Sequence, residues 1–272
     1  MENMHAVILG ILQGLAEFLP VSSSGHLVLC QEYLGFKEPQ LLLDLVLHLG
    51  TLLAVCVYFY SDLKNMFRET ILFFLDVYNG RAHFGDIHTR SQAELALMVL
   101  VGTVPTGIIG LTFRSYLERL FADPTMVGFA LISTGFILLI TRFLPGDENR
   151  KDYVMILPAL LVGTAQGIAL IPGISRSGIT IVCGMLCGLK WELAARFSFL
   201  LAIPAILGAV VLQLHSETPV SGEYLSLFAG FVTSFIVGIV ALKILMGIVN
   251  RGRLYLFSPY CWLVGTLAIC FG

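Results

Sequence analysis

Six long runs of apolar residues recur along this chain of 272 residues, with shorter polar segments between them. A helix that crosses the hydrocarbon core of a bilayer needs about 20 consecutive, mostly apolar residues. Each of the six runs is long enough, so each is predicted to be a transmembrane helix. They lie at about 40–60, 94–113, 125–142, 193–214, 224–248 and 255–272.

Two further apolar regions, at about 5–36 and 153–190, differ because a polar break interrupts each near its middle. The breaks are Pro20–Gly25 (Pro-Val-Ser-Ser-Ser-Gly) and Pro172–Gly178 (Pro-Gly-Ile-Ser-Arg-Ser-Gly). Each half is shorter than the roughly 17 residues that a span requires. Irregular polar backbone is tolerated at membrane depth only inside protein or beside a water-filled cavity. The pattern therefore predicts two re-entrant helical hairpins whose tips meet inside the bundle.

The two broken regions resemble each other at a fixed offset of 153 residues. Gln13–Ala16 matches Gln166–Ala169, and Val21–Gly25 matches Ile174–Gly178. Two aligned blocks at one offset favour a true repeat over chance similarity between apolar segments, which is the alternative. The sequence thus predicts an all-α polytopic membrane protein with one integral membrane domain. That domain covers 1–272, with repeat one at about 1–142 and repeat two at about 153–272.

The basic residues predict how the chain is oriented, because cytoplasmic loops carry an excess of Lys and Arg. If spans alternate and each hairpin returns to its own side, one face receives eleven of the sixteen basic residues and the other receives three. The richer face is predicted to be cytoplasmic, which puts both termini outside. The first hairpin then enters from outside and the second from inside. This is an inverted-topology repeat, an architecture common among secondary transporters.

The composition supports a membrane protein and excludes other classes. Hydrophobic residues make up 57% of the chain and charged residues 12%, whereas soluble domains carry roughly 25% charged residues. The net charge of −2 gives no basic face, so no nucleic-acid partner is expected. The six cysteines lie mostly in apolar stretches and are expected to be small buried hydrophobes rather than zinc ligands or disulfides. The first apolar segment lacks the basic start of a cleaved signal, so we expect it to remain.

Polar side chains occur in the first hairpin on both sides of its break. Gln13 and Glu17 are four residues apart and share one helix face. An ionisable group at membrane depth is costly and usually functional, and a glutamate that snorkels from a helix end is the alternative.

Serines and a histidine follow the break of the first hairpin. With a serine at the N-cap, the free N–H groups of the next helix make a small anion-binding site; the candidates are Ser22, Ser23 and Ser24. In that first turn His26 could act as nucleophile or general acid–base group. A histidine with purely structural hydrogen bonds is the alternative.

The second break supplies a positive partner, because Arg176 lies within it. Hydroxyls flank this residue at Ser175, Ser177 and Thr180. A guanidinium beside helix N-terminal amides suits a phosphate, which Arg can hold with two hydrogen bonds. The alternative is a structural ion pair between Arg176 and Glu17 that joins the two hairpins.

Two other regions carry weaker signals. Asp44 and His48 share a helix face and could either line the cavity or hold the site residues in place. The polar segment 61–93 has an apolar middle at 70–75. It is expected to be a cytoplasmic loop with an interfacial helix and no chemistry.

The two hairpin motifs resemble the signature motifs of a known family. Gln13–His26 and Pro172–Thr180 are similar to those of the undecaprenyl-diphosphate phosphatases of the bacitracin-resistance family. The resemblance covers nearly the full length, including Leu47–Thr51 and Phe197–Pro204. The first position of the first motif is Glu or Gln in the family. Here it is Gln13, which leaves Glu17 as the only carboxylate of that pair.

The resemblance implies hydrolysis of undecaprenyl diphosphate, a C55 isoprenyl lipid, to the monophosphate in the bacterial plasma membrane. This reaction recycles the lipid carrier of cell-wall synthesis, and overproduction of such enzymes gives resistance to bacitracin. The resemblance also implies a divalent cation, Mg²⁺ or Ca²⁺. The family's site residues carry over to Glu17, Ser22, Ser23, His26, Ser175, Arg176, Ser177 and Thr180.

Charge then suggests how these residues would work on a diphosphate. A cation that bridges Glu17 and the phosphate oxygens, with Gln13 as a further ligand to consider, would prevent repulsion between the two anions. Arg176 and its flanking serines would clamp the diphosphate. The nucleophile is left open between His26, Ser23 with a neighbouring base, and water activated by His26.

A transporter or flippase that moves a lipid phosphate through the same inverted-repeat site is the alternative from a different class. Such a carrier would need the arginine but no nucleophile. In either case the protein is expected to be surrounded by membrane lipid. Whether it forms a homodimer is left open.

Overall fold

The computed structural model describes residues 3–36, 40–113, 123–214 and 224–271, and these segments are helical with no β-strand among them. The helices are α1 (Asn3–Ala16), α2 (Ser23–Tyr33), α3 (Leu41–Tyr58), α4 (Tyr60–Tyr78), α5 (Ser91–Thr112), α7 (Pro124–Ile140), α8 (Ile156–Ile168), α9 (Arg176–Leu186), α10 (Trp191–Leu214), α11 (Tyr224–Val249) and α12 (Ser258–Phe271). Short 3₁₀ turns occur at Phe84–Thr89, Thr141–Phe143 and Leu254–Phe257.

Six helical segments in the described part of the chain are long and apolar enough to cross a membrane. They are Leu41–Tyr58, Ser91–Thr112, Pro124–Phe143, Trp191–Leu212, Tyr224–Val249 and Leu254–Phe271. The predicted all-α polytopic class and its six spans are therefore confirmed. The three basic residues assigned to the outer face, Lys37, Arg114 and Arg119, lie outside the described residues.

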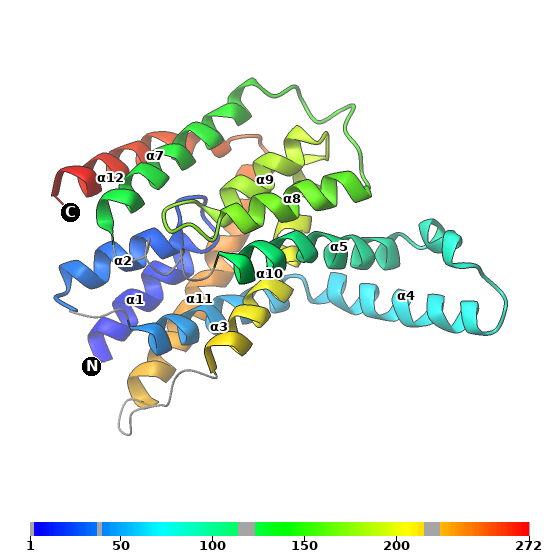
Figure 1. Cartoon of the computed structure of the whole chain (residues 1–272), viewed down its shortest axis with the longest axis horizontal. Coiled ribbons are helices and arrows are strands. Elements are labelled where there is room, and N and C mark those ends of the chain that lie inside the picture. The colour runs from blue at the N-terminus through cyan, green and yellow to red at the C-terminus, as the bar shows by residue number, and fades with distance from the viewer. Residues whose placement is uncertain (1–2, 37–39, 114–122, 215–223, 272) are drawn as a thin grey trace.

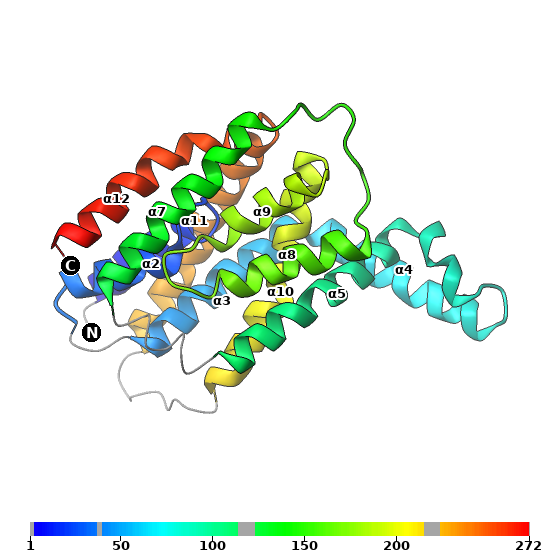
Figure 2. The ribbon, with the colours of Figure 1, turned by 45° about the horizontal axis from the view of Figure 1, so that its top comes forward.

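The two broken regions form helical hairpins that open toward opposite ends of the bundle (Figures 1 and 2). The hairpin α1–α2 opens toward the end where α12 finishes, and α8–α9 opens toward the end from which α4 projects. Their tips meet as predicted, since a Cβ added to Gly25 would lie 3.1 Å from the Cα of Gly173. A Cβ at Gly178 would likewise approach the Cβ of Pro20 to 3.3 Å. Re-entrant insertion and the inverted repeat stay predictions, with which this arrangement agrees.

Each hairpin packs against a long helix of the other half of the chain. The first half-helix α1 lies along α11, and α8 lies along α5. Glycines permit close approach at both contacts, as small residues do in membrane helix pairs. A Cβ at Gly10 would come within 2.8 Å of the carbonyl oxygen of Gly230, and one at Gly163 would overlap the carbonyl of Gly102. This crosswise packing is what a two-fold relation between the halves would produce.

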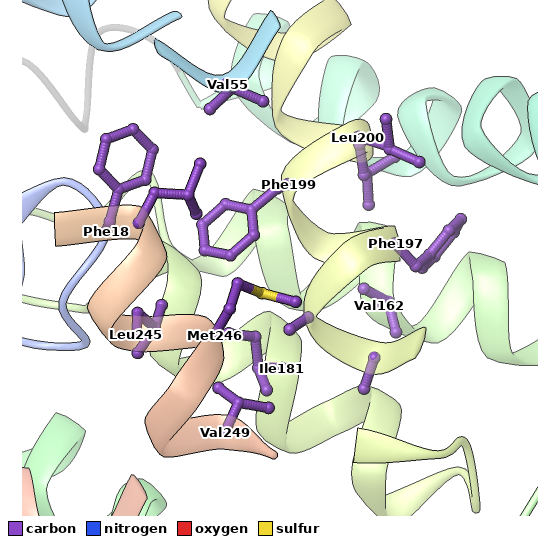
Figure 3. Close-up of a cluster of buried hydrophobic side chains, with 14 of the residues drawn as sticks. Phe18, Val55, Val162, Ile181, Phe197, Phe199, Leu200, Leu245, Met246 and Val249 are labelled. Atoms are coloured by element: carbon purple, nitrogen blue, oxygen red, sulfur yellow. The ribbon is translucent and has the colours of Figure 1, made fainter. Parts of the chain in front are cut away.

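A buried apolar cluster joins side chains of the first hairpin to side chains from α9, α10 and α11 (Figure 3). Phe18, which directly follows Glu17, is fully buried there and meets Phe199 edge to face at 5.7 Å between ring centroids. Such an aromatic pair contributes about 0.5–1.5 kcal/mol beyond its burial. The cluster therefore anchors the backbone that carries Glu17.

The segment 61–93 is more helical than its apolar middle suggested. It contains the 19-residue helix α4, which runs antiparallel to α5 and projects from one end of the bundle (Figure 1). Met66 and Phe73, seven residues apart, are the buried residues of α4. Arg90 also pairs with Asp76 at 2.5 Å. The helix expected in this segment is therefore present, but it is longer than the apolar middle at 70–75.

Candidate active site

The carboxylate of Glu17 is the centre of a buried polar cluster just after the end of α1. Its side chain is only 3% exposed, and Arg176 donates to Oε1 through Nη2. The other oxygen, Oε2, accepts from the amide of Gln13 at 2.9 Å and from the hydroxyl of Ser23 at 2.6 Å. His48 Nε2 lies 3.7 Å from the same oxygen. The structure thus brings four predicted site residues together, from both hairpins.

The contact between Glu17 and Arg176 joins the two hairpins, as the structural alternative expected. This pair does not use the whole guanidinium. Nη1 of Arg176 is buried and has no hydrogen-bond partner within the described residues. A buried donor without a partner costs about 1–3 kcal/mol. A phosphate oxygen would satisfy it, so the pair also leaves a binding function open.

The serines close the first turn of the second half-helix in each hairpin, as the capping prediction requires. Ser22 accepts from the N–H of Gly25 at 3.4 Å, and its Oγ lies 3.4 Å from that of Ser24. Ser175 and Ser177 repeat this arrangement in the second hairpin, with a 3.3 Å separation of their hydroxyl oxygens. The free N–H groups of two helix N-termini therefore lie in the two breaks.

The turn that carries Arg176 is held by one hydroxyl from the neighbouring helix α7 and one from α9 itself. Thr134 on α7 donates to the carbonyl of Gly173 at 3.0 Å and accepts from the N–H of Ser175 at 3.0 Å. Thr180 donates to the carbonyl of Arg176 at 2.7 Å, and its oxygen lies 2.5 Å from Oγ of Ser198 on α10. Thr180 thus stabilises the turn through these two contacts. Its direct contact with a phosphate stays a prediction.

His26 has hydrogen-bond partners at both ring nitrogens, as the structural alternative expected. Its Nδ1 lies 2.8 Å from the carbonyl oxygen of Ser22, and its Nε2 lies 2.8 Å from the hydroxyl of Tyr260 on α12. Among the described residues, the imidazole that approaches Glu17 belongs to His48. Both nitrogens of His26 are therefore occupied, and the histidine is held beside the serine turn rather than against the carboxylate.

Three residues near the site were missed or only weakly indicated by the sequence. His48, held through Nδ1 by the carbonyl of Asp44 at 2.7 Å, had a signal in its shared helix face with Asp44. Thr134 and Tyr260 had none, because their contacts join helices distant along the chain. Only the packing of α7 and α12 against the hairpins could reveal them.

The cluster contains oxygen atoms that could serve as ligands for a hard divalent cation. No group of three or more His, Cys, Asp or Glu that could hold a metal occurs in the described part of the chain. The carboxylate of Glu17 lies beside Gln13, whose Oε1 is buried without a partner among the described residues. Mg²⁺ is often held by one or two carboxylates together with substrate phosphates. The residues therefore fit Mg²⁺ or Ca²⁺ in the presence of a phosphate ligand.

The chain is similar to known proteins over nearly its whole length. The family model described as bacitracin resistance protein BacA matches residues 6–267. An undecaprenyl-diphosphatase of Desulfatibacillum aliphaticivorans is 43% identical over 271 residues, which cover 99% of this chain and 98% of that protein. Another of Desulfosudis oleivorans is 44% identical over 283 residues, which cover 100% of this chain and 99% of that protein. The polar cluster between the hairpins thus belongs to a member of the bacitracin resistance protein BacA family.

Proposed function

We propose that this chain is an undecaprenyl-diphosphatase, a membrane hydrolase that converts undecaprenyl diphosphate to undecaprenyl phosphate and phosphate. The observation that carries the proposal is the contact of Ser23 and Arg176 with one buried carboxylate, Glu17. It joins a hydroxyl nucleophile, a base and a phosphate-binding cation across the two hairpins. The relatives named for this reaction match both hairpins as well as the spans.

Binding of the diphosphate would use donors from both breaks. Arg176 offers the unpartnered Nη1, and charge-assisted contacts of Arg with phosphate are short and directional. The N-terminal N–H groups of α2 and α9 add partial positive charge. Since phosphoryl transfer depends mainly on positioning and charge stabilisation, these groups account for much of the expected catalysis.

The geometry favours Ser23 as the nucleophile among the alternatives, because its hydroxyl already donates to Glu17 at 2.6 Å. Ser23 Oγ would bond to the terminal phosphorus while its proton passes to Glu17. The bond from that phosphorus to the bridging oxygen breaks, and undecaprenyl phosphate leaves with the electron pair. Water then attacks the phosphoserine, and Glu17 returns the proton to Ser23 as phosphate departs.

A divalent cation would add charge that Arg176 alone cannot supply. Glu17 and Gln13 are the residues that would hold Mg²⁺ or Ca²⁺, which would neutralise phosphate charge and orient the terminal group. In the arrangement described here Arg176, Gln13 and Ser23 all donate to Glu17. Cation binding would therefore require Arg176 to turn toward the phosphate.

We infer that the protein lies in the bacterial plasma membrane with both termini outside. The excess of basic residues on one face supports this orientation. The first hairpin would then reach the site from outside and the second from inside. In this setting the reaction recycles the lipid carrier of cell-wall synthesis and confers bacitracin resistance.

The protein could also form a homodimer, which the mass of the purified protein in detergent would measure.

Purified protein in detergent micelles separates hydrolysis from transport, because micelles have no second compartment. We expect phosphate release from undecaprenyl diphosphate that depends on an added divalent cation. Absence of release at any cation concentration would contradict the proposal. The comparisons give no support to a transporter, since the relatives are named as diphosphatases.

A further inference from the structure

Tyr260, in the first turn of α12, contacts the serine turn through His26 and has no part in the steps above. Its hydroxyl lies 2.8 Å from Nε2 of His26, and the two ring planes are parallel within 6°. His26 is 8% exposed whereas Tyr260 is 44% exposed. The tyrosine is therefore more exposed than the histidine that it contacts.

The hydrogen bonds of His26 determine which nitrogen carries its proton. The carbonyl of Ser22 can only accept, so Nδ1 of His26 must be the N–H donor in that 2.8 Å contact. In the neutral ring, Nε2 is then the acceptor, and the hydroxyl of Tyr260 is its donor. The Ser22 carbonyl thus selects the Nδ1–H tautomer, and Tyr260, whose hydroxyl can donate or accept, donates to Nε2 and holds the ring in place.

The carbonyl of Ser22 matters because this residue has a strained backbone. Its φ of 70° lies in the left-handed region, which non-glycine residues adopt only where the surroundings enforce it. Two donors hold its carbonyl, the backbone N–H of His26 at 3.2 Å and the ring of the same residue. The next residue is Ser23, whose hydroxyl reaches Glu17. The orientation of the nucleophile therefore depends on how Ser22 is held.

A second contact shows that α12 fixes this break at two points. The thiol of Cys261, the residue after Tyr260, is 3.6 Å from the carbonyl oxygen of Pro20 and is fully buried. Tyr260 and Cys261 therefore bind the break on either side of Ser22. The second break is held similarly, by Thr134 of α7, the helix that packs against α12.

We propose that Tyr260 is a positioning residue for the hydrolysis. By donating to Nε2 it keeps the His26 ring oriented so that its Nδ1–H holds the strained Ser22 backbone and thereby keeps Ser23 against Glu17. This inference rests on the proposed function and on Ser23 as nucleophile. It differs from a role of His26 as nucleophile, which would require Nε2 to be released from Tyr260.

Tyr260→Phe tests the proposal because it removes the donor and keeps the ring. We expect kcat to fall about three- to tenfold, as for loss of one neutral hydrogen bond, with KM changed less than about twofold. Tyr255→Phe is the matched control. Its ring lies 5.9 Å from the guanidinium of Arg142, a contact that phenylalanine retains, so both constants should stay at parental values.

The tautomer of His26 provides a readout independent of rate. In protein carrying ¹⁵N-labelled histidine in detergent, parental His26 should show a protonated Nδ1 and a hydrogen-bonded, unprotonated Nε2, and Tyr260→Phe should move the Nε2 resonance toward that of a free acceptor. A parental Nε2–H tautomer would overturn the proposal even if the variant failed to fold. An unchanged kcat with an unchanged Nε2 resonance in Tyr260→Phe would also overturn it. A rise in kcat would identify released Nε2 as the reactive group instead, again against the proposal.

The two failures can be told apart. If the parental protein releases no phosphate, the proposed function fails, and the tautomer measurement still reports whether Tyr260 orders His26. If the parental protein is active and only Tyr260→Phe behaves like the parent, hydrolysis stands and the positioning role is lost.

Discussion

The two hairpin breaks share their capping geometry but differ in the residue placed between the serines. Ser22 and Ser175 accept from the N–H three residues ahead at 3.4 and 3.1 Å. Each also lies within hydrogen-bond distance of a second serine two residues on. Between the paired serines stand Ser23 in one break and Arg176 in the other. The same capped turn thus occurs twice, once with the proposed nucleophile and once with the proposed phosphate-binding guanidinium at its centre.

The backbone conformation of the capping serine also differs between the two breaks. Ser22 has a φ of 70°, whereas Ser175 has a φ of −73°, an ordinary value. A left-handed non-glycine residue costs of order 1–3 kcal/mol. The strain therefore lies beside Ser23, and the binding turn is relaxed. If Ser23 is the nucleophile, as proposed, the strain at Ser22 helps to hold its hydroxyl in position.

The largest expected effect is that of Ser23→Ala. If Ser23 forms the phosphoryl intermediate, its loss should lower kcat by about three decades or more, as for other nucleophiles. Phosphate release by the purified variant is the measurement. Ser133→Ala is the control and should leave the rate unchanged, because within the described residues Ser133 bonds to its own helix, at the carbonyl of Phe129. A nearly parental rate for Ser23→Ala would return the nucleophile to His26 or to water.

Arg176→Lys should have the next largest effect on rate. Lys keeps the charge but lacks the planar pair of donors, so we expect a loss of about 3–4 kcal/mol of transition-state stabilisation, or two to three decades in rate. Arg196→Lys serves as the comparison, since Arg196 pairs with Asp62 near the base of α4. If both variants hydrolyse at similar rates, Arg176 is only a tie between the hairpins.

The ion pair between Glu17 and Arg176 also predicts how substitutions change stability, separately from their effect on rate. Arg176→Gln leaves the Glu17 carboxylate buried without its cation, which typically costs about 3–5 kcal/mol. The double variant Glu17→Gln/Arg176→Gln removes both charges and should recover most of that loss while staying inactive. Unfolding by denaturant in detergent measures both variants. A single variant as stable as the parent would mean that the pair does not hold the hairpins together.

Much of the architecture could be predicted from the sequence because it follows from local composition. Apolar run length located the six spans, and Pro, Gly and Ser located the breaks. The meeting of the tips, seen at Gly25 and Gly173, followed from the cost of polar backbone in lipid. The full length of α4 did not, since the helix extends beyond its apolar middle and packs against α5.

The site was predictable by residue but not by contact. Spacing put Gln13 and Glu17 on one face and identified Arg176 as the partner in the second break. It could not establish that His48, rather than His26, approaches Glu17, because the rotation of α3 about its axis depends on neighbouring helices. Tyr260 is 234 residues away from His26 along the chain, so no local pattern links them.

The smallest effect, and the sharpest comparison of the breaks, comes from placing glycine at both capping serines. At position 22 glycine suits the positive φ, and replacing a serine cap by glycine costs only a few tenths of a kcal/mol. Relief of strain should offset the extra chain entropy, so Ser22→Gly should be neutral or more stable by up to about 1 kcal/mol.

At position 175 the backbone is relaxed, so the same change relieves nothing. Ser175→Gly should therefore lose about 1 kcal/mol from the added chain entropy and the weaker cap. Thermal unfolding of the two purified variants measures the difference directly. Equal destabilisation by both substitutions would mean that Ser22 is not strained in solution. The positioning of Ser23 by an enforced backbone would then lose its physical basis, even if Ser23 remained the nucleophile.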